Sequence, residues 1–334
     1  MSKTLLLSSL VVVFLVGTAR LPAAQRVERA SIEAIKASAN QGDAAAQFRL
    51  GWLYDKGRGV PRDDAEALSW YRKAADQGYA SAQYVLGLRY EEGKGVPRDP
   101  AEAVKWYRKA ADQGLADAQF RLGWCYDEAK GVRQDDAEAV KWFRKAADQG
   151  DANAQYNLGT CYDEGKGVAQ DFAEAVSWYH KAAAQGFTPA QYNLGVCYDK
   201  GEGIRQDYAE AARWYRKPAE EGHVIAQFRL GRFYEQGLGT SRDDAEAVKW
   251  YRKAADQGFA KAQYFLGLRY DQGKGVPQDE IEAYVWLSVS AAQGWKEAPE
   301  RRDAVAKRMS PKALIEAQRR TNAFVPTKSK HRKN

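Results

Sequence analysis

Apolar residues recur at helical spacing along most of the chain, and the pattern restarts at fixed intervals. In one such segment Ala118, Leu122 and Tyr126 are four residues apart, and Ala139 is followed by Trp142 and Phe143. Spacings of three and four residues place apolar side chains on one face of a helix. Glycine and aspartate separate the two apolar runs of each segment, so each segment predicts a helix, a loop of about six residues and a second helix.

The segments are repeats of a single unit. The dipeptide Ala-Gln occurs seven times at a constant interval of 36 residues, and seven units cover residues 43–294 without an insertion. Self-similarity at a period of 20–50 residues is typical of solenoids, in which each unit packs only on its neighbours. We therefore predict an all-α solenoid of seven helix-turn-helix repeats, numbered here 1 to 7.

The ends of the predicted helices have recognisable signals. Asp135 and Glu138 form a D-x-x-E variant of the capping box at the start of a second helix. The first glycine of a G-x-G motif fits the left-handed position after each first helix. Repeat 3 has Ala129 where the other repeats have this glycine, so its first helix is expected to end less cleanly. Gly123 suits a close approach of two helices.

Both ends of the array are expected to carry helical caps. Residues 25–42 have the pattern of a helix, and residues 295–325 contain Ser310 and Pro311, an N-cap and first-turn proline for a last helix. Residues 326–334 are basic and lack apolar periodicity, which predicts a disordered tail that either contacts an anionic surface or is simply solvated.

Charge is concentrated at the C-terminal end. Residues 295–334 hold 12 Lys and Arg against 4 Asp and Glu, whereas the rest of the chain is close to neutral. This distribution argues against a uniformly basic, nucleic-acid-binding body. We expect no nucleic-acid partner and a monomeric chain.

The first residues resemble a secretory signal. Residues 1–24 comprise one lysine, an apolar run from Leu5 to Val16 and then small residues. Cleavage is expected after Ala19 or near Ala24, which would give a periplasmic or secreted protein. The alternative is an uncleaved N-terminal anchor, although Arg20 makes the apolar run shorter than the roughly 20 residues of a membrane span.

The repeated motifs resemble the Sel-one-like repeat family, a relative of the tetratricopeptide repeat. The shared motifs are Ala-Gln-Phe/Tyr, Leu-Gly, Tyr, Gly-x-Gly-Val, Asp-x-x-Glu-Ala and Trp-Tyr, in register over residues 43–294. The resemblance implies a right-handed superhelix that binds other proteins on its concave side, with no catalytic residues and no cofactor. It also leaves one alternative, because secreted relatives have been described as binding or cleaving β-lactam or cell-wall material.

Four variable columns of each first helix step by four, three and four residues, so their side chains share one face, which we call the variable stripe. The stripe mixes tryptophan, arginine and asparagine with apolar residues, a composition typical of interfaces. The alternative is that these positions vary only because they face water. The candidate partner-binding residues are Arg49, Trp52, Arg121, Trp124, Asn157, Asn193, Arg229, Arg232 and Phe265.

Two other columns suggest chemistry, and both have simpler explanations. Cys125, Cys161 and Cys197 occupy one column, but equivalent positions of stacked repeats lie roughly 10–20 Å apart, too far for a disulfide. The column also holds Leu53 and Phe233, which indicates a hydrophobic position. A column of seven acidic residues resembles a calcium ladder, but single carboxylates one repeat apart cannot cluster as calcium requires. Neutralisation by nearby lysines is expected instead, and no metal site is predicted.

Histidine offers little for catalysis. The chain has three: His180 on a basic face, His223 at the start of a first helix and His331 in the tail. No serine or cysteine partner can be placed beside them from the sequence. We therefore expect a non-enzymatic scaffold that is exported and binds a protein or peptide.

Overall fold

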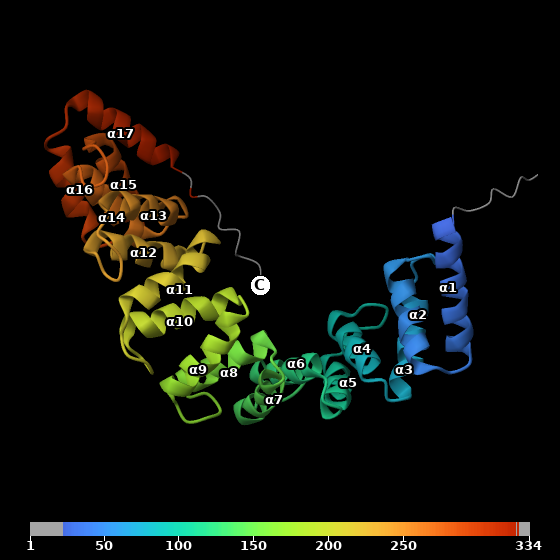
Figure 1. The fold of residues 1–334 in the computed structure, drawn as a ribbon. Coiled ribbons are helices and arrows are strands. Elements are labelled where there is room, and N and C mark those ends of the chain that lie inside the picture. Colours follow the sequence, from blue (N-terminus) through green and yellow to red (C-terminus); the bar gives the residue numbers. More distant parts are fainter. Residues whose placement is uncertain (1–22, 325, 327–334) are drawn as a thin grey trace, which may run out of the picture. The chain divides into compact units, whose positions relative to one another are not determined.

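The protein is an all-α array, as predicted. A computed structural model describes residues 23–324 and residue 326, and these residues form seventeen helices and no strand (Figure 1). The expected signal segment, residues 1–24, lies outside the described residues except for Ala23 and Ala24, and the expected tail lies outside them except for Pro326. No helix of the described part is both long and apolar enough to span a bilayer.

Each repeat contributes two antiparallel helices that pack on each other. The first helices of the seven repeats are α2 (Ala44–Lys56), α4 (Ala80–Glu92), α6 (Ala116–Asp127), α8 (Ala152–Glu164), α10 (Thr188–Lys200), α12 (Val224–Gln236) and α14 (Ala260–Gln272). The second helices are α3 (Asp64–Asp76), α5 (Pro100–Asp112), α7 (Asp136–Asp148), α9 (Phe172–Ala184), α11 (Tyr208–Glu220), α13 (Asp244–Asp256) and α15 (Glu280–Ala292).

Additional helices lie at both ends of the array. Helix α1 (Ala23–Asn40) precedes the first repeat and packs on α2. At the other end α16 (Ala298–Ala306) and α17 (Pro311–Ala323) both pack on α15. Ser310 caps α17 through its side chain and Pro311 begins the helix, as the sequence predicts.

The predicted caps form, with one difference. The Asp135 carboxylate accepts a hydrogen bond from the Glu138 backbone N–H at 2.9 Å, which satisfies one of the free donors at the helix start. Glu138 does not complete the capping box, because its side chain pairs with Lys141 one turn further along. In repeats 5 and 7 the equivalent glutamates, Glu210 and Glu282, accept from a tryptophan indole N–H, and Glu210 also pairs with Arg213.

Repeat 3 ends its first helix as expected from Ala129. This alanine takes φ 53°, the only positive φ of a non-glycine residue in the described chain, and α6 is one residue shorter than the other first helices. The left-handed region costs an L-residue with a Cβ roughly 1–2 kcal/mol, which glycine avoids. The equivalent Gly165 takes the same conformation without that cost.

The invariant glutamine of the Ala-Gln motif connects consecutive helices. Gln119 Nε2 donates to the Ala111 carbonyl at 3.1 Å, and Gln149 Nε2 donates to Gln119 Oε1 at 2.7 Å. The glutamine is buried, so both bonds satisfy polar groups that water cannot reach. Repeat 5 breaks this chain of bonds. It has Glu221 at the position of Gln149, and an ionised carboxylate cannot donate to the Gln191 side-chain oxygen.

Packing within a repeat depends on a large residue facing a small one. In repeat 3 a Cβ at Gly123 would lie 2.7 Å from the Phe143 ring, so glycine is needed for this approach. Packing between repeats uses a tryptophan: Trp178 of repeat 4 packs on Phe143 of repeat 3, in a core that also contains Leu158. A single repeat therefore cannot complete its own core.

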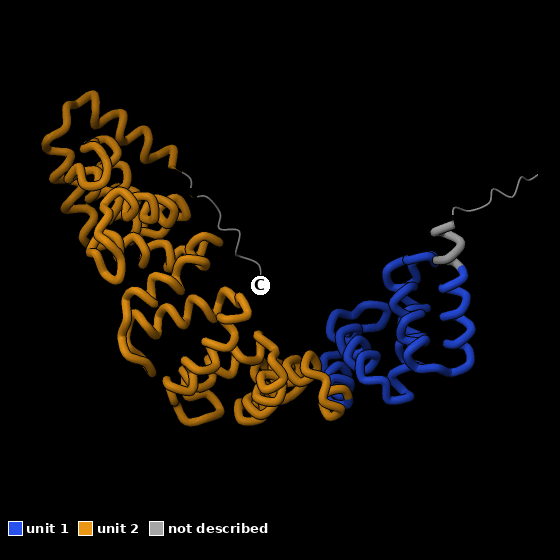
Figure 2. The backbone as a smooth tube through the Cα atoms, in the orientation of Figure 1, with its two compact units in different colours: residues 1–109 blue, residues 110–334 orange. Residues whose placement is uncertain are grey.

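The contacts divide the chain into two compact units, residues 1–109 and residues 110–334, and the division falls within α5 (Figure 2). The sequence predicts a bend near residues 215–224, because Pro218 lies near the end of the second helix of repeat 5 and lacks an N–H donor. Helix α11 continues through Pro218, which is buried, and the Pro218 carbonyl accepts the normal closing hydrogen bond from His223 at 2.9 Å. The bend stays a prediction.

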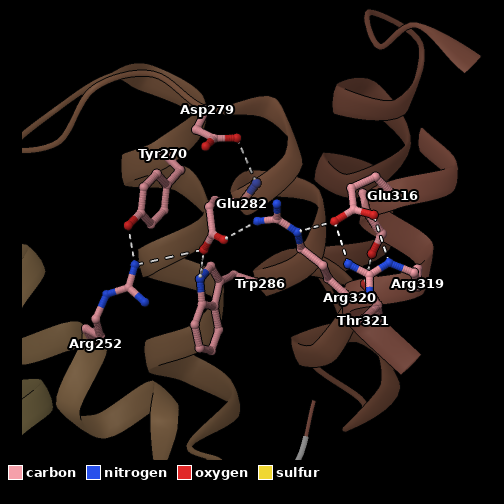
Figure 3. A network of polar contacts seen from close by, with 10 residues as sticks. Arg252, Tyr270, Asp279, Glu282, Trp286, Glu316, Arg319, Arg320 and Thr321 are labelled. Atoms are coloured by element: carbon pink, nitrogen blue, oxygen red, sulfur yellow. Dashed lines mark hydrogen bonds and ion pairs between the residues drawn. The ribbon is translucent and has the colours of Figure 1, made fainter. Parts of the chain in front are cut away.

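The C-terminal helix α17 is attached to the last repeat by a polar network (Figure 3). Glu282 on α15 accepts from Arg320 at 3.2 Å and from the Trp286 indole at 3.0 Å. Glu316 on α17 in turn accepts from Arg319 and Arg320, and these hydrogen bonds hold the pKa of its carboxyl well below the usual range. The network joins the closing helix to the array through side chains as well as through apolar packing.

Two arginines occupy the column that the sequence suggests is hydrophobic. Arg89 and Arg269 lie at the same repeat position as Cys125, Cys161 and Cys197 and are 4% and 7% exposed. Each pairs with an acid of the preceding repeat: Arg89 with Asp55 at 2.5 Å, and Arg269 with Glu235 at 2.6 Å. The column is therefore buried, as expected, but it is not uniformly apolar.

Candidate partner-binding surface

The candidate residues of the variable stripe are accessible, whereas the framework residues on the same helices are buried. In repeat 3, Arg121 and Trp124 are half-buried, while Leu122 and Cys125 beside them are buried. The helical period separates these neighbours, because a step of one residue turns the side chain by about 100°. The same separation holds at Trp52, which is exposed, and Leu53, which is buried.

Several stripe residues contact one another rather than pointing freely into water. The Arg121 guanidinium lies 6.0 Å from the centre of the Trp124 ring. Asn157 Nδ2 donates to the Asn153 carbonyl at 2.8 Å. The Asn157 amide thus already has a partner within the protein, and holding a peptide backbone would require it to share or exchange that bond.

Repeats 5 to 7 hollow the surface into a cavity of about 280 Å³. Two stripe residues predicted as candidates, Arg229 and Arg232, line it, and the third candidate there, Phe265, lies under the Arg232 guanidinium at 4.7 Å. We call this feature the cationic cavity. Its lining comprises Asp199, Tyr208, Phe228, Arg229, Arg232, Phe233, Gln236, Leu238 and Lys261.

The accessible lining of the cavity is mainly polar. Phe228 and Phe233 line it but are only 4% and 2% exposed, so their rings offer a ligand little apolar surface. Arg229 is exposed, and Arg232 and Lys261 are half-buried. Arginine and lysine bury their methylene stems while the charged group stays accessible, which suits a rim position. The lining includes no serine, cysteine or histidine.

The anionic groups at the cavity are already engaged. Asp199 is 10% exposed, and it accepts from the Tyr215 hydroxyl at 3.2 Å and pairs with Arg229 at 3.4 Å. Glu235, beside the rim, is held by Arg269 at 2.6 Å, whereas Arg232 is 3.6 Å away. Three cations line the cavity against one carboxylate, so the rim carries a surplus of positive charge.

Sequence reasoning missed most of the cavity lining. Phe228 and Phe233 belong to framework columns, and Asp199 belongs to the acidic column, so none of them varies in the way that defines the stripe. Lys261 belongs to the variable stripe but is not among the nine candidates. The available signal was charge: Arg229, Arg232 and Lys261 place three cations on the variable faces of two consecutive first helices.

The columns that suggested other chemistry have structural roles. Carboxylates of the acidic column pair with cations of the following repeat, as Asp55 does with Lys94 at 3.2 Å and Asp127 with Lys166, whereas Asp163 accepts from the Tyr179 hydroxyl of its own repeat. Burial raises the pKa of the Cys161 and Cys197 thiols to about 12, which keeps both protonated and unreactive. His223 caps α12 by accepting from the Ala226 N–H.

Comparisons with known proteins agree with the repeat architecture. A solved protective antigen of uropathogenic Escherichia coli strains, described as displaying an SLR fold, is 38% identical, with a TM-score of 0.69 over 87% of this chain and 71% of the other. A solved Sel1 repeat protein from Oxalobacter formigenes is 37% identical, with a TM-score of 0.61 over 84% of this chain and 81% of the other. No curated protein matches the chain.

The repeats themselves match a single family description. The Sel1 repeat matches seven consecutive segments, residues 44–79, 80–115, 116–151, 152–187, 188–223, 224–259 and 260–295. These segments agree within one residue with the boundaries predicted from the Ala-Gln period and cover well over half of the chain. The chain therefore belongs to the Sel1 repeat family.

Proposed function

We propose that this chain is an exported scaffold that binds a protein or peptide partner on the variable stripe of its first helices. Sel1 repeats form a scaffold fold that commonly mediates protein–protein interaction and is mainly non-enzymatic. The observation that carries the proposal is the separation along each first helix. Framework side chains are buried between helices, while the variable positions are accessible and rich in tryptophan and arginine, the residues that dominate binding energy at interfaces.

Two tryptophans in repeat 3 test this separation. Trp142→Ala removes a buried framework side chain, 5% exposed, and is expected to lower the free energy of unfolding by about 3–5 kcal/mol. Trp124→Ala removes a half-buried stripe side chain, so a smaller loss of stability is expected, together with weaker partner capture. The measurements are denaturant unfolding followed by circular dichroism, and capture of partners from an extract by the immobilised protein.

The result that contradicts the proposal is equal destabilisation by the two substitutions with unchanged capture by Trp124→Ala. That outcome would make the stripe part of the framework. Arg49→Ala serves as a second stripe variant, because Arg49 is exposed and its loss leaves no group of the protein unpaired.

Export is the second part of the proposal and rests on the order of charged, apolar and small residues in segment 1–24. A fusion of residues 1–40 to a reporter enzyme active only outside the cytoplasm is expected to be active. N-terminal sequencing of the exported protein distinguishes cleavage near Ala19 or Ala24 from the uncleaved anchor. A reporter that stays inactive would remove export from the proposal.

A further inference from the structure

We propose that the cationic cavity of repeats 5 to 7 binds a carboxylate-bearing segment of the partner. The inference rests on the proposed function, because it names the chemistry of the partner that the stripe receives. It comes from two observations within residues 110–334: a surplus of cations over carboxylates at the cavity, and the occurrence of this combination of cations in one pair of consecutive repeats.

The cations of the rim have few anions of their own. Among the described residues no carboxylate lies within ion-pair distance of Lys261, whose ammonium instead lies 5.3 Å from the centre of the Phe228 ring. Arg232 is 3.6 Å from Glu235, but that carboxylate is held more closely by Arg269. Hydrogen bonds from arginine and lysine to a carboxylate are shorter and stronger than neutral ones. An incoming carboxylate would therefore supply the charge that the rim lacks.

The size of the cavity limits what it can hold. About 280 Å³ is at the low end of the range for small-molecule sites, roughly 300–1,000 Å³. The space suits one or two side chains of a protein segment, whose carboxylates would reach the cations of the rim.

The cavity is specific to one part of the array. Arginine also occurs at the column of Arg229 in repeats 1 and 3, as Arg49 and Arg121, but their partners in the other two columns are uncharged or acidic. Only repeats 6 and 7 have cations at all three positions. A contact required for repeat stacking would be expected in every repeat, whereas a contact for one ligand is needed only once.

The test uses the purified protein from residue 25 onward and a fluorescein-labelled peptide in which two glutamates flank a phenylalanine. Fluorescence anisotropy should show saturable binding that weakens with salt. Replacing both glutamates of the peptide by glutamine should weaken binding about tenfold or more. The double variant Arg232→Glu/Lys261→Glu should weaken it at least as much.

Matched variants keep the test independent of folding. Arg133→Glu reverses the charge of an exposed loop arginine in repeat 3 that lies outside the stripe and the cavity lining, and binding should be unchanged. Arg232→Gln/Lys261→Gln removes the charge without introducing repulsion, and circular dichroism identifies any variant that has unfolded. Binding that is insensitive to both double variants, or equal for the glutamate and glutamine peptides, would overturn the proposal. The absence of saturable binding below about 1 mM would do the same.

The inference and the proposed function can fail separately. If partner capture is lost in Trp124→Ala but retained in Arg232→Glu/Lys261→Glu, the stripe binds a partner and the cavity does not receive it. If no stripe variant alters capture while the peptide still binds the cavity, the proposed function is wrong and the acidic-peptide site remains.

Discussion

Repeats 2 and 7 differ from repeats 3 to 5 in the residue that fills one buried position of the first helix. At the same buried position of the first helix, repeats 2 and 7 place Arg89 and Arg269, whereas repeats 3 to 5 place a cysteine. The acidic neighbour from the preceding repeat is present in both cases. In repeat 4 it is Asp127, which pairs with the loop residue Lys166 rather than with the buried position. The buried charge is thus one of two ways to neutralise the same carboxylate.

The two arginines also differ from each other. Asp55 pairs with Arg89 and has further partners in Lys94 at 3.2 Å and Lys56 at 3.2 Å. Glu235 is 13% exposed, and Arg269 is its closest cation. A buried pair is destabilised most when one partner is removed and the other stays charged and uncompensated. The two sites should therefore respond unequally to loss of the arginine.

The largest effect is expected for Arg269→Leu. The substitution leaves the Glu235 carboxylate largely buried without its closest cation, so the free energy of unfolding should fall by about 3–5 kcal/mol. Denaturant unfolding of the full chain measures this loss of stability. Hydrogen exchange then shows whether the loss falls within residues 110–334. Cys161→Leu is the matched control at the same column, since it removes no charge partner. A loss below about 1 kcal/mol for Arg269→Leu would mean that the pair is not buried in solution.

A second effect depends on pH. Burial disfavours the charged form of Asp55, but hydrogen bonds from Arg89, Lys56 and Lys94 outweigh it and lower the pKa from 3.8 to about 2. A lowered pKa stabilises the fold above the unfolded value, and this contribution is lost as the pH falls from about 4 towards 2. The loss should be about 2 kcal/mol. Unfolding midpoints between pH 5 and pH 2 measure it, and Asp55→Asn should flatten the dependence in this window. An equally steep dependence in that variant would assign it to other carboxylates.

A smaller effect is expected for Arg89→Cys, which copies the arrangement of repeats 3 to 5. Lys94 and Lys56 remain beside Asp55, so we expect a loss of about 1–2 kcal/mol, less than for Arg269→Leu. The comparison of the two variants in the same denaturant assay is the measurement. Equal losses would show that the lysines do not compensate for the arginine.

The repeat framework was predictable from the sequence because its rules are local. The period of 36 residues, the aspartate caps and the left-handed glycines predict the helices, and Ala129 even marks the helix that ends early. The buried arginines and the cationic cavity depend instead on which residues of adjacent repeats meet. Arg89 lies in a column that also holds Leu53 and Phe233, so the sequence alone does not explain a buried arginine there. Its burial is explained by the contact with Asp55, which belongs to the preceding repeat.

The cysteines should give the smallest change in stability and the clearest chemical difference. Burial, with a further contribution from the charge of Asp127, raises the pKa of Cys161 to about 12. At pH 8 the thiolate fraction should then be roughly a thousandfold below that of an ordinary cysteine, and the packing around the sulfur also blocks reagent. We expect almost no thiol of the native protein to react with a chromogenic aromatic disulfide. After unfolding in urea, three thiols per chain should react. Arg49→Cys, which adds an exposed thiol, should react at once and shows that the reagent is active.

Rapid reaction of the native thiols would mean that this column opens readily. Fewer than three reactive thiols after unfolding would mean that two of the cysteines form a disulfide. Cys125, Cys161 and Cys197 would then be a covalent link between repeats rather than a hydrophobic column.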